Sequence, residues 1–504
     1  MNPSSFLTSP KNIIAVLLLL PLFSLTQETP ASTELYRPQF HFTPHKGWMN
    51  DPNGMVYFNG KYHLFFQHNP DSTVWGPMHW GHAVSRDLVH WEELPIALYP
   101  DSLGTIFSGS AVIDSANTAG FGKNAMVAIY TNHNATLEKT GSDKFQNQSI
   151  AYSPDEGSSW IKYKKNPVLL NPGIRDFRDP KVFWYRPGKK WILTLATLDH
   201  ITFYSSPDLK HWTEESRFGK NLGAHGGVWE CPDLFALDDH GHPVWVLIVN
   251  LNPGGPNGGS ATQYFTGSFD GHSFTPDDAR IKWLDYGPDE YAGITWSGTG
   301  DRKIFLGWMS NWQYANRVPT QNWRSAMTLP RDLSIKKIND QYRIASLPVK
   351  EFSKTLHPVQ QLSNRIVKND LDLKSVTEGT FQLDLEGLSR TDFTIELSNT
   401  EGNKLAIGFD KKANRYFIDR THSGSTDFSE VFAGKHVAPR LSSSQFINLK
   451  MIVDVASVEL FADNGLTVMT SIFFPKQPFT NIRVKPANPL RIKELKLSKI
   501  HLPK

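Results

Sequence analysis

Cysteine is almost absent from this sequence. Cys231 is the only cysteine among 504 residues, which excludes an internal disulfide framework and any zinc site built from several cysteines. No histidine lies beside it in the sequence, so we expect a packing residue and not a nucleophile. Charge of one sign is also lacking, because 52 basic and 49 acidic residues give a net charge of +3. This balance gives no electrostatic reason to expect a nucleic acid as partner.

Long hydrophobic runs are missing except for one near the start of the chain. The apolar residues at 13–23 follow a single basic residue, Lys11. This run is too short to span a membrane and has the layout of a secretory signal. We therefore expect residues 1–27 to be a signal peptide. The protein is expected to be secreted or periplasmic and to have no membrane span.

Helical periodicity is almost missing from residues 38–335, where short apolar strands alternate with turns of Gly, Pro, Asn and Asp. A repeat runs through this region: a strand ends in Ser-x-Asp, a turn follows, and an aromatic residue opens the next strand. Its four copies are Ser85-Arg86-Asp87 with Trp91, Ser153-Pro154-Asp155 with Trp160, Ser206-Pro207-Asp208 with Trp212, and Ser268-Phe269-Asp270 with Phe274. A spacing of roughly 50–70 residues fits one four-stranded blade with generous loops. With a further set of hairpins at the end, the region is predicted to be a five-bladed β-propeller.

Tryptophan is missing beyond residue 353, although the chain has 15 of them. Residues 336–352 carry no strong turn or repeat signal and are expected to be a linker. Beyond them, strands such as those at 380–385 and 457–461 alternate with period two, which predicts a β-sandwich over residues 353–504. We expect it to support the structure or build the rim. A carbohydrate-binding role is the weaker alternative, because tryptophan platforms are missing.

One stretch of the predicted propeller, Trp48-Met49-Asn50-Asp51-Pro52-Asn53-Gly54, places a carboxylate at the entry of a strand. Pro52 keeps Asp51 extended, and Gly54 lets the backbone turn tightly. Composition alone would favour a surface turn, since these residue types are the usual turn formers.

Two further stretches share the pattern of carboxylate, proline, strand, turn and strand, and they outweigh the surface-turn interpretation. They are Arg178-Asp179-Pro180 and Trp229-Glu230-Cys231-Pro232-Asp233. The innermost strand of every blade lines the central channel of a propeller, so equivalent positions on different blades converge. Asp51, Asp179 and Glu230 are therefore predicted to occupy equivalent positions and to meet in one pocket. The strand that begins at Phe107-Ser108 should line the same pocket.

These motifs, together with Phe66-Gln67 and Phe107-Ser108-Gly109-Ser110, closely resemble glycoside hydrolase family 32, the invertases, inulinases, levanases and fructan exohydrolases. The resemblance covers nearly the whole chain after the signal. It implies that Asp51 is the nucleophile, Glu230 the general acid and base, and Asp179 a stabiliser of the transition state. It also implies a sugar subsite shaped by Trp48, Met49, Asn50, Gln67, Trp75, Phe107, Ser108, Arg178 and Trp312. The histidines at 79, 82 and 90 lack metal-ligand spacing, and no metal or other cofactor is expected.

The resemblance implies an exported retaining β-fructofuranosidase that removes terminal fructose from levan or inulin, and also from sucrose. Cleavage of a ketofuranoside passes through an oxocarbenium-like transition state, so one carboxylate attacks while a second, protonated one delivers a proton. Two alternatives stay open: a fructose-binding propeller without catalysis, and an endo-acting fructanase. The preferred substrate depends on loops around the pocket, and the sequence does not fix the oligomeric state.

Overall fold

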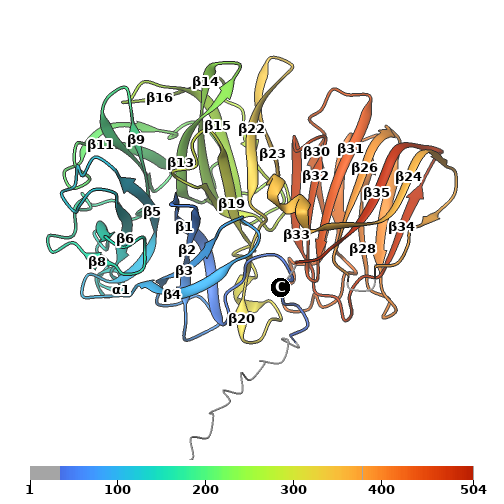
Figure 1. Cartoon of the computed structure of the whole chain (residues 1–504), viewed down its shortest axis with the longest axis horizontal. Coiled ribbons are helices and arrows are strands. Elements are labelled where there is room, and N and C mark those ends of the chain that lie inside the picture. Colours follow the sequence, from blue (N-terminus) through green and yellow to red (C-terminus); the bar gives the residue numbers. More distant parts are fainter. Residues whose placement is uncertain (1–33, 377–378, 503–504) are drawn as a thin grey trace, which may run out of the picture. The chain divides into compact units, whose positions relative to one another are not determined.

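The computed structural model describes residues 34–376 and 379–502, and the predicted signal peptide lies outside the described residues. The described residues from 35 onward form one unit, in which seven β-sheets are found. Figure 1 shows five curled sheets in blue to yellow and two further sheets in orange and red. The predicted fold class, a five-bladed propeller followed by a β-sandwich, is confirmed. No helix in the described ranges is long and apolar enough to cross a membrane.

Each propeller blade is a meander of four antiparallel strands, with the inner strand first in the chain. Blade 1 has β1 (Gly47–Phe58), β2 (Lys61–Asn69), β3 (His79–Ser85) and β4 (Glu92–Leu98). Blade 2 has β5 (Thr105–Asp114), β6 (Ala125–His133), β7 (Gln146–Ser153) and β8 (Ile161–Lys162), with α1 (Ala135–Lys139) between β6 and β7. Blade 3 has β9 (Phe177–Tyr185), β10 (Lys190–Thr197), β11 (His200–Ser206) and β12 (Thr213–Phe218). Blade 4 has β13 (Val228–Asp239), β14 (His242–Asn252), β15 (Ala261–Phe269), β16 (Phe274–Pro276) and the short β17 (Lys282–Trp283). Blade 5 has β18 (Tyr291–Thr295), β19 (Lys303–Met309), β22 (Arg331–Ile338), β23 (Gln341–Pro348) and the short β21 (Ala326–Met327).

The Ser-x-Asp repeat forms the turn between the third and fourth strands of blades 1 to 4. In blade 1, Asp87 accepts hydrogen bonds from the backbone N–H groups of Val89 and His90, while Ser85 Oγ accepts one from Leu88. Asp208 makes the matching bonds in blade 3. The aspartate thus satisfies backbone donors that the turn would otherwise leave unpaired. The repeat predicted the blades because each copy needs the same turn chemistry.

Blade 1 is closed by a segment from much later in the chain. The short strand β20 (Trp323–Arg324) pairs in parallel with the start of β1, with Gly47 opposite Trp323 and Trp48 opposite Arg324. The 3-10 helix η1 (Ala315–Arg317) lies shortly before β20 in the chain. β20 therefore covers the start of the open edge of the strand that carries Asp51.

The expected linker at residues 336–352 is instead largely strand. Residues 331–338 and 341–348 pair as the hairpin β22–β23, and the 3-10 helix η2 (Lys350–Thr355) follows. The two turn residues, Asn339 and Asp340, have φ of 47° and 59°. Such values suit a two-residue type I′ turn, which matches the twist of antiparallel strands. The fifth blade replaces the Ser-x-Asp turn with this one, and the repeat therefore gave no signal for it.

The sandwich packs two six-stranded sheets face to face. One sheet has the order β24 (Leu356–Val367), β35 (Leu490–Ile500), β26 (Phe381–Ser389), β31 (Phe446–Asp454), β32 (Ser457–Ala462) and β33 (Thr467–Ile472). The other has the order β25 (Leu371–Asp372), β34 (Asn481–Pro486), β27 (Phe393–Ser398), β28 (Lys404–Asp410), β29 (Arg415–Asp419) and β30 (Lys435–Pro439). Alternate residues face inward, as Leu383 and Leu385 of β26 and Ile395 of β27 do, each with no exposed surface.

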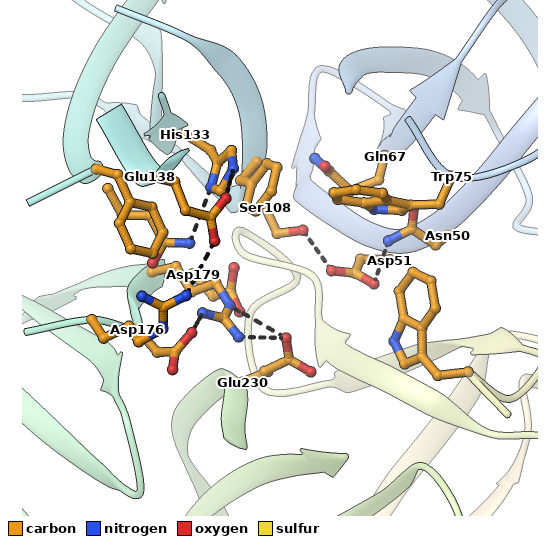
Figure 2. Close-up of a pocket in the computed structure, with 16 residues that line it drawn as sticks. Asn50, Asp51, Gln67, Trp75, Ser108, His133, Glu138, Asp176, Asp179 and Glu230 are labelled. Atoms are coloured by element: carbon orange, nitrogen blue, oxygen red, sulfur yellow. Dashed lines mark hydrogen bonds and ion pairs between the residues drawn. The ribbon is translucent and has the colours of Figure 1, made fainter. Parts of the chain in front are cut away.

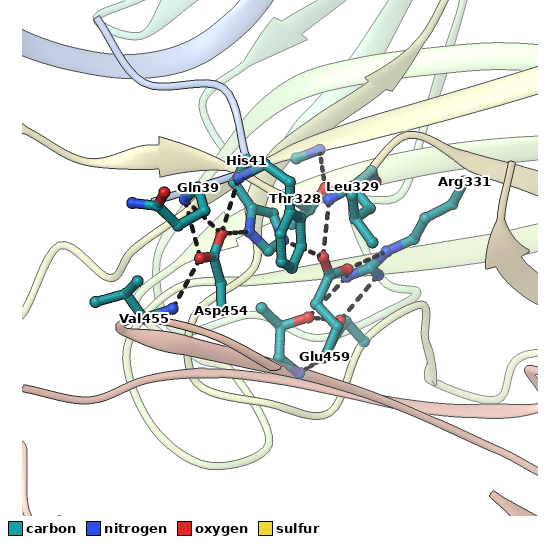
Figure 3. A network of polar contacts seen from close by, with 12 residues as sticks. Gln39, His41, Thr328, Leu329, Arg331, Asp454, Val455 and Glu459 are labelled. Carbon is teal, nitrogen blue, oxygen red and sulfur yellow. Dashed lines mark hydrogen bonds and ion pairs between the residues drawn. The ribbon is translucent and has the colours of Figure 1, made fainter. Parts of the chain in front are cut away.

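A buried ionic network joins propeller residues to the sandwich (Figure 3). His41 Nδ1 lies 2.8 Å from Asp454 Oδ2, and His41 Nε2 lies 2.8 Å from Glu459 Oε1. Arg331 of β22 donates from Nε to Glu459 Oε2 over 3.0 Å and pairs through Nη1 with Asp285 Oδ2 at 2.9 Å. Burial alone would lower the pKa of His41, but the hydrogen bonds and charges of Asp454 and Glu459 outweigh it and raise this pKa to about 9. His41 is thus a buried cation that holds two carboxylates.

The free energy of unfolding is expected to fall as pH rises from about 7 to 10. The folded pKa of His41 lies above its ordinary value of 6.5, so its contribution is complete below pH 6.5 and is lost as pH rises through about 9. A shift of this size corresponds to about 3 kcal/mol. Urea unfolding followed by fluorescence at several pH values measures the loss. His41→Gln should flatten the curve over this range, and an equal slope in that variant would show that other groups cause it.

Candidate active site

The inner strands of all five blades carry a β-bulge at the same level. Two residues of the inner strand lie opposite one residue of its partner at 50–51, 107–108, 179–180, 231–232 and 292–293. A bulge breaks the alternation of side chains and re-aims them. Several side chains from each inner strand can therefore turn toward the central channel.

The bulges correct the prediction that the three acids occupy equivalent positions. Asp179 is the first bulge residue of β9, Asp51 is the second bulge residue of β1, and Glu230 precedes the bulge of β13. The structural equivalent of Asp179 is Cys231, and both have left-handed backbone, with φ of 63° and 42°. In regular strands, such a one-residue offset would send the side chains to opposite faces. The bulges let them converge in spite of it.

The three carboxylates meet in one pocket of about 270 Å³ (Figure 2). A pocket of this size can admit a sugar unit. Most of the predicted sugar-subsite residues lie on its walls, namely Asn50, Gln67, Trp75, Phe107, Ser108, Arg178 and Trp312. Trp48 and Met49 are not among its lining residues, because both are fully buried beneath it.

Asp51 is held by hydrogen bonds to both of its carboxylate oxygens. Asn50 Nδ2 donates to Oδ1 over 2.8 Å, and Ser108 Oγ donates to Oδ2 over 2.7 Å. Trp48 Nε1 in turn donates to Asn50 Oδ1 over 2.7 Å, which fixes the orientation of the Asn50 amide. Burial and then the negative charge of Glu230 raise the pKa of Asp51, while the bonds from Ser108 and Asn50 oppose the rise. The carboxylate is thus aimed, partly desolvated and supported as an anion.

Glu230 accepts hydrogen bonds from two sides. Arg178 donates to Oε1 from Nε over 3.2 Å and from Nη2 over 2.9 Å, and the Tyr291 hydroxyl donates to Oε2. Arg178 also pairs through Nη1 with Asp176. Tyr291 begins β18, the inner strand of blade 5, and burial and then the charge of Glu230 raise the pKa of its hydroxyl. The phenol therefore stays protonated and remains a donor beside Glu230.

Asp179 lies deeper, with 5% of its surface exposed. Its Oδ2 accepts a hydrogen bond from the backbone N–H of Cys231 over 3.0 Å and lies 3.9 Å from Arg178 Nε. Burial raises the pKa of Asp179 to about 7; Arg178 opposes this, and the charges of Glu230 and Asp51 add to it. The pKa of Asp179 is thus raised by its burial and by like charge in the same pocket.

Cys231 lies between two of the acids. Its Sγ is 3.6 Å from both Asp51 Oδ2 and Asp179 Oδ2. Burial raises the pKa of the Cys231 thiol, and the neighbouring carboxylates raise it further. A thiol that stays protonated is a weak donor and a poor nucleophile, which agrees with the packing role expected from the sequence.

Aromatic rings form one side of the pocket. Trp75 is 43% exposed, and its ring meets Phe107 edge to face at 6.1 Å between centroids. Trp312 stacks on Trp48 at 5.8 Å and packs against Trp308 at 4.9 Å. Flat apolar rings at a pocket mouth suit the C–H faces of a sugar.

The sequence did not predict the residues on the side of the pocket opposite the aromatic rings. It also did not predict Tyr291 as the hydrogen-bond donor to Glu230. The missed lining residues are His133, Glu138, Phe145, Gln146, Arg175 and Asp176. Most of them lie in α1 or in connections between strands, where no repeat marks them. Tyr291 was missed because its strand lacks the carboxylate and proline of the other motifs. Its place at the start of the fifth inner strand was the available signal.

No group of three or more His, Cys, Asp or Glu side chains within residues 34–376 and 379–502 is arranged to hold a metal ion. The arrangement provides three carboxylates in one pocket with an aromatic side. A five-bladed propeller with this equipment is a glycoside hydrolase.

The chain belongs to glycosyl hydrolases family 32. The model of the family's N-terminal domain matches residues 41–348, and that of its C-terminal domain matches residues 349–499. A levanase of Bacillus subtilis (strain 168) is 46% identical over 473 residues, which cover 90% of this chain and 69% of the levanase. An extracellular exo-inulinase of Aspergillus awamori is 40% identical over 491 residues, which cover 89% of this chain and 91% of the inulinase.

Solved structures agree with this assignment. The crystal structure of exo-inulinase from Aspergillus awamori has a TM-score of 0.85 and 39% identity, and covers 92% of this chain and 98% of its own. The β-fructofuranosidase from Schwanniomyces occidentalis complexed with fructosyl-erythritol has a TM-score of 0.85 and 34% identity, and covers 93% of this chain and 98% of its own.

Proposed function

We propose that this protein is an exported, exo-acting fructan β-fructosidase that works by double displacement. The observation that carries the proposal is the convergence of Asp51 and Glu230 on one pocket of about 270 Å³. The relatives named for levan and inulin support fructan as the substrate class. Incubation of the purified protein with sucrose, inulin and levan, followed by chromatography of the products, tests it. If fructose were released from none of the three substrates, the proposal would be overturned.

Asp51 acts as the nucleophile in this mechanism. Its carboxylate attacks the anomeric carbon of the terminal fructose and forms a covalent fructosyl-enzyme, while the glycosidic oxygen leaves with a proton from Glu230. The two bonds from Asn50 and Ser108 hold the attacking group in one orientation. Positioning of this kind lowers the barrier, because the entropy of bringing the reacting groups together is lost on binding and not in the chemical step.

Glu230 first gives a proton and then takes one. After it protonates the leaving oxygen, Arg178 and Tyr291 stabilise the carboxylate that remains. That carboxylate then removes a proton from the water that attacks the fructosyl-enzyme, which restores both groups. Asp179 lies within the same pocket and grips fructose hydroxyls as positive charge develops on the ring. Arg178 joins Asp179 to Glu230 and sets their relative position.

The predicted export rests on separate support. The Aspergillus awamori relative is named extracellular, and the apolar segment at residues 13–23 has the layout of a secretory signal. Expression in a secreting host, with N-terminal sequencing of the protein recovered from outside the cell, tests the export and the cleavage near residue 27. Retention of the intact chain inside the cell would contradict it.

The first fructose released is expected to be the β-anomer, released one unit at a time. A nucleophilic Asp51 gives two inversions and therefore net retention. In an exo-acting enzyme, the part of the pocket beside Asp51 accepts a chain end and excludes the middle of a chain. Early NMR spectra of a fructan digest report the anomer before it equilibrates, and chromatography of the same samples reports product length. First-formed α-anomer would remove Asp51 from the nucleophile role, and a ladder of oligomers would indicate endo action.

A further inference from the structure

One wall of the pocket is built from charged side chains that the mechanism above leaves without a role. His133 ends β6, Glu138 lies in α1, and Arg175 and Asp176 precede β9. His133 Nε2 lies 3.2 Å from Glu138 Oε2, and Arg175 Nη2 lies 3.5 Å from Glu138 Oε1. Figure 2 shows His133, Glu138 and Asp176 on the opposite side of the pocket from Trp75 and Asn50. We call these four residues the charged wall.

The charged wall starts at the proton donor. Arg178 contacts Glu230 through Nη2 at 2.9 Å and Asp176 through Nη1, so one guanidinium joins the donor to the wall. In double displacement, the leaving group departs from the side opposite the nucleophile and lies beside the group that protonates it. The sugar that leaves must therefore lie on the Glu230 side of the pocket, where the charged wall continues.

The outer part of the charged wall is open to solvent and keeps hydrogen-bonding capacity. The side chains of Arg175 and Glu138 are 54% and 36% exposed. A guanidinium has five N–H donors and a carboxylate accepts about four bonds, so both can bind sugar hydroxyls while they stay paired.

A second hollow continues from the wall. It has a volume of about 510 Å³ and shares His133 with the pocket. It is lined by the polar side chains of Ser102, Thr105, Asn134, Thr136 and Thr140, and by apolar groups that include Pro100 and Leu137. The polar groups donate to and accept from sugar hydroxyls. Through His133, the space beside Glu230 is therefore continued by a hollow that has both polar and apolar groups for further sugar units.

We propose that the charged wall and the adjoining hollow bind the leaving part of a fructan chain. The inferred ligand is a fructose oligosaccharide longer than a disaccharide. His133 and Asp176 face the first leaving unit, while Glu138 and Arg175 bind the units beyond it. This inference rests on the proposed function, because it assigns a place to the leaving chain of that reaction.

Arg175→Gln and Glu138→Gln test the inference through the split between KM and kcat. For fructans of three or more units, each change should raise KM about tenfold and leave kcat within twofold. For sucrose, whose leaving group is a single sugar, both constants should stay within twofold. Arg217→Gln is the matched control, because Arg217 pairs with Glu214 on the surface with side-chain exposures of 52% and 42%. It should change nothing.

The outcomes separate the wall from the reaction. Equal losses on sucrose and on long chains would place the two residues at the reaction centre. No loss on any substrate would show that the leaving part of the fructan binds elsewhere. Either result overturns the inference. Calorimetric titration of a fructan pentasaccharide into Asp51→Asn, with and without Arg175→Gln, tests binding without turnover. A tenfold weaker Kd in the double variant supports the wall. A wild-type protein that cleaves no fructoside would refute the proposed function, while the titration would still decide the binding site.

Discussion

Replacement of Asp51 by asparagine is expected to lower kcat for fructoside hydrolysis by about 10⁴-fold or more while the protein stays folded. A factor of this size corresponds to about 5.5 kcal/mol of transition-state stabilisation. The amide is a poor nucleophile, so the fructosyl-enzyme cannot form. Initial rates on sucrose and inulin, with circular dichroism and thermal unfolding of the same samples, measure both parts of the expectation.

The fold should tolerate this change because the asparagine can keep both contacts. Its oxygen can accept from Asn50 Nδ2, and its amide can donate to Ser108 Oγ, whose hydroxyl also accepts. Burial disfavours the Asp51 anion, as its raised pKa shows, so a neutral group removes a cost and the melting temperature should stay equal or rise. Asp340→Asn is the control, since that carboxylate is 98% exposed and remote from the pocket. A folded Asp51→Asn protein with more than a few per cent of the wild-type rate would end the nucleophile assignment.

Replacement of Glu230 by alanine is expected to lower kcat on sucrose and fructans by roughly 10³-fold, with partial rescue by azide on a suitable substrate. Sugar leaving groups need a proton, which alanine cannot supply. An aryl fructoside whose leaving group departs without a proton still forms the fructosyl-enzyme. Azide, a small anion, can then enter the space left by the carboxylate and attack without a general base. The product should be the β-fructosyl azide, identified by NMR.

Two further variants separate chemistry from structure in this experiment. Glu230→Ala removes the acceptor of the Tyr291 hydroxyl and one of the carboxylates that pair with Arg178, and the weaker pairing of this buried guanidinium destabilises the protein. Glu230→Gln retains an acceptor oxygen, so it should restore stability but not hydrolysis of sucrose. Asp51→Ala should give no β-fructosyl azide, because no fructosyl-enzyme forms. Formation of the β-fructosyl azide by that variant, or its absence in a folded Glu230→Ala protein, would contradict the assigned roles, whereas an α-fructosyl azide from Asp51→Ala would show azide in the place of the nucleophile.

The blades and the convergence of the three acids could be predicted from the sequence because both depend on repeated local chemistry. Each Ser-x-Asp turn satisfies its own backbone donors, and the inner strand of every propeller blade lines the central channel. The exact register could not be predicted, because a bulge adds one residue without leaving a mark in composition. Pro180 and Pro232 are the second bulge residues of blades 3 and 4. In blades 1 and 2 that position is held by Asp51 and Ser108, so no proline marks the bulge there.

The charged wall was beyond the reach of the sequence for a different reason. Glu138 and Arg175 lie on connections, whose paths have no periodicity and follow contacts formed after the blades assemble. Tyr291 combines both situations, since its strand position was predictable but its contact with Glu230 crosses from one blade to the next. The hairpin over residues 331–348 shows the limit within strands, because its Asn339-Asp340 turn replaced the repeat used to count blades.

The pairing of β20 with β1 also governs when the protein becomes active during its synthesis. The strand that carries Asp51 emerges early, but its parallel partner at Trp323–Arg324 emerges only after four blades and the first two strands of the fifth have been made. At roughly 5–20 residues per second, that interval lasts tens of seconds. During this time the edge of β1 is a free template for pairing with another chain. A nascent chain thus stays both inactive and vulnerable until the ring closes, so a chaperone that covers the first blade in this interval should raise the yield of active protein.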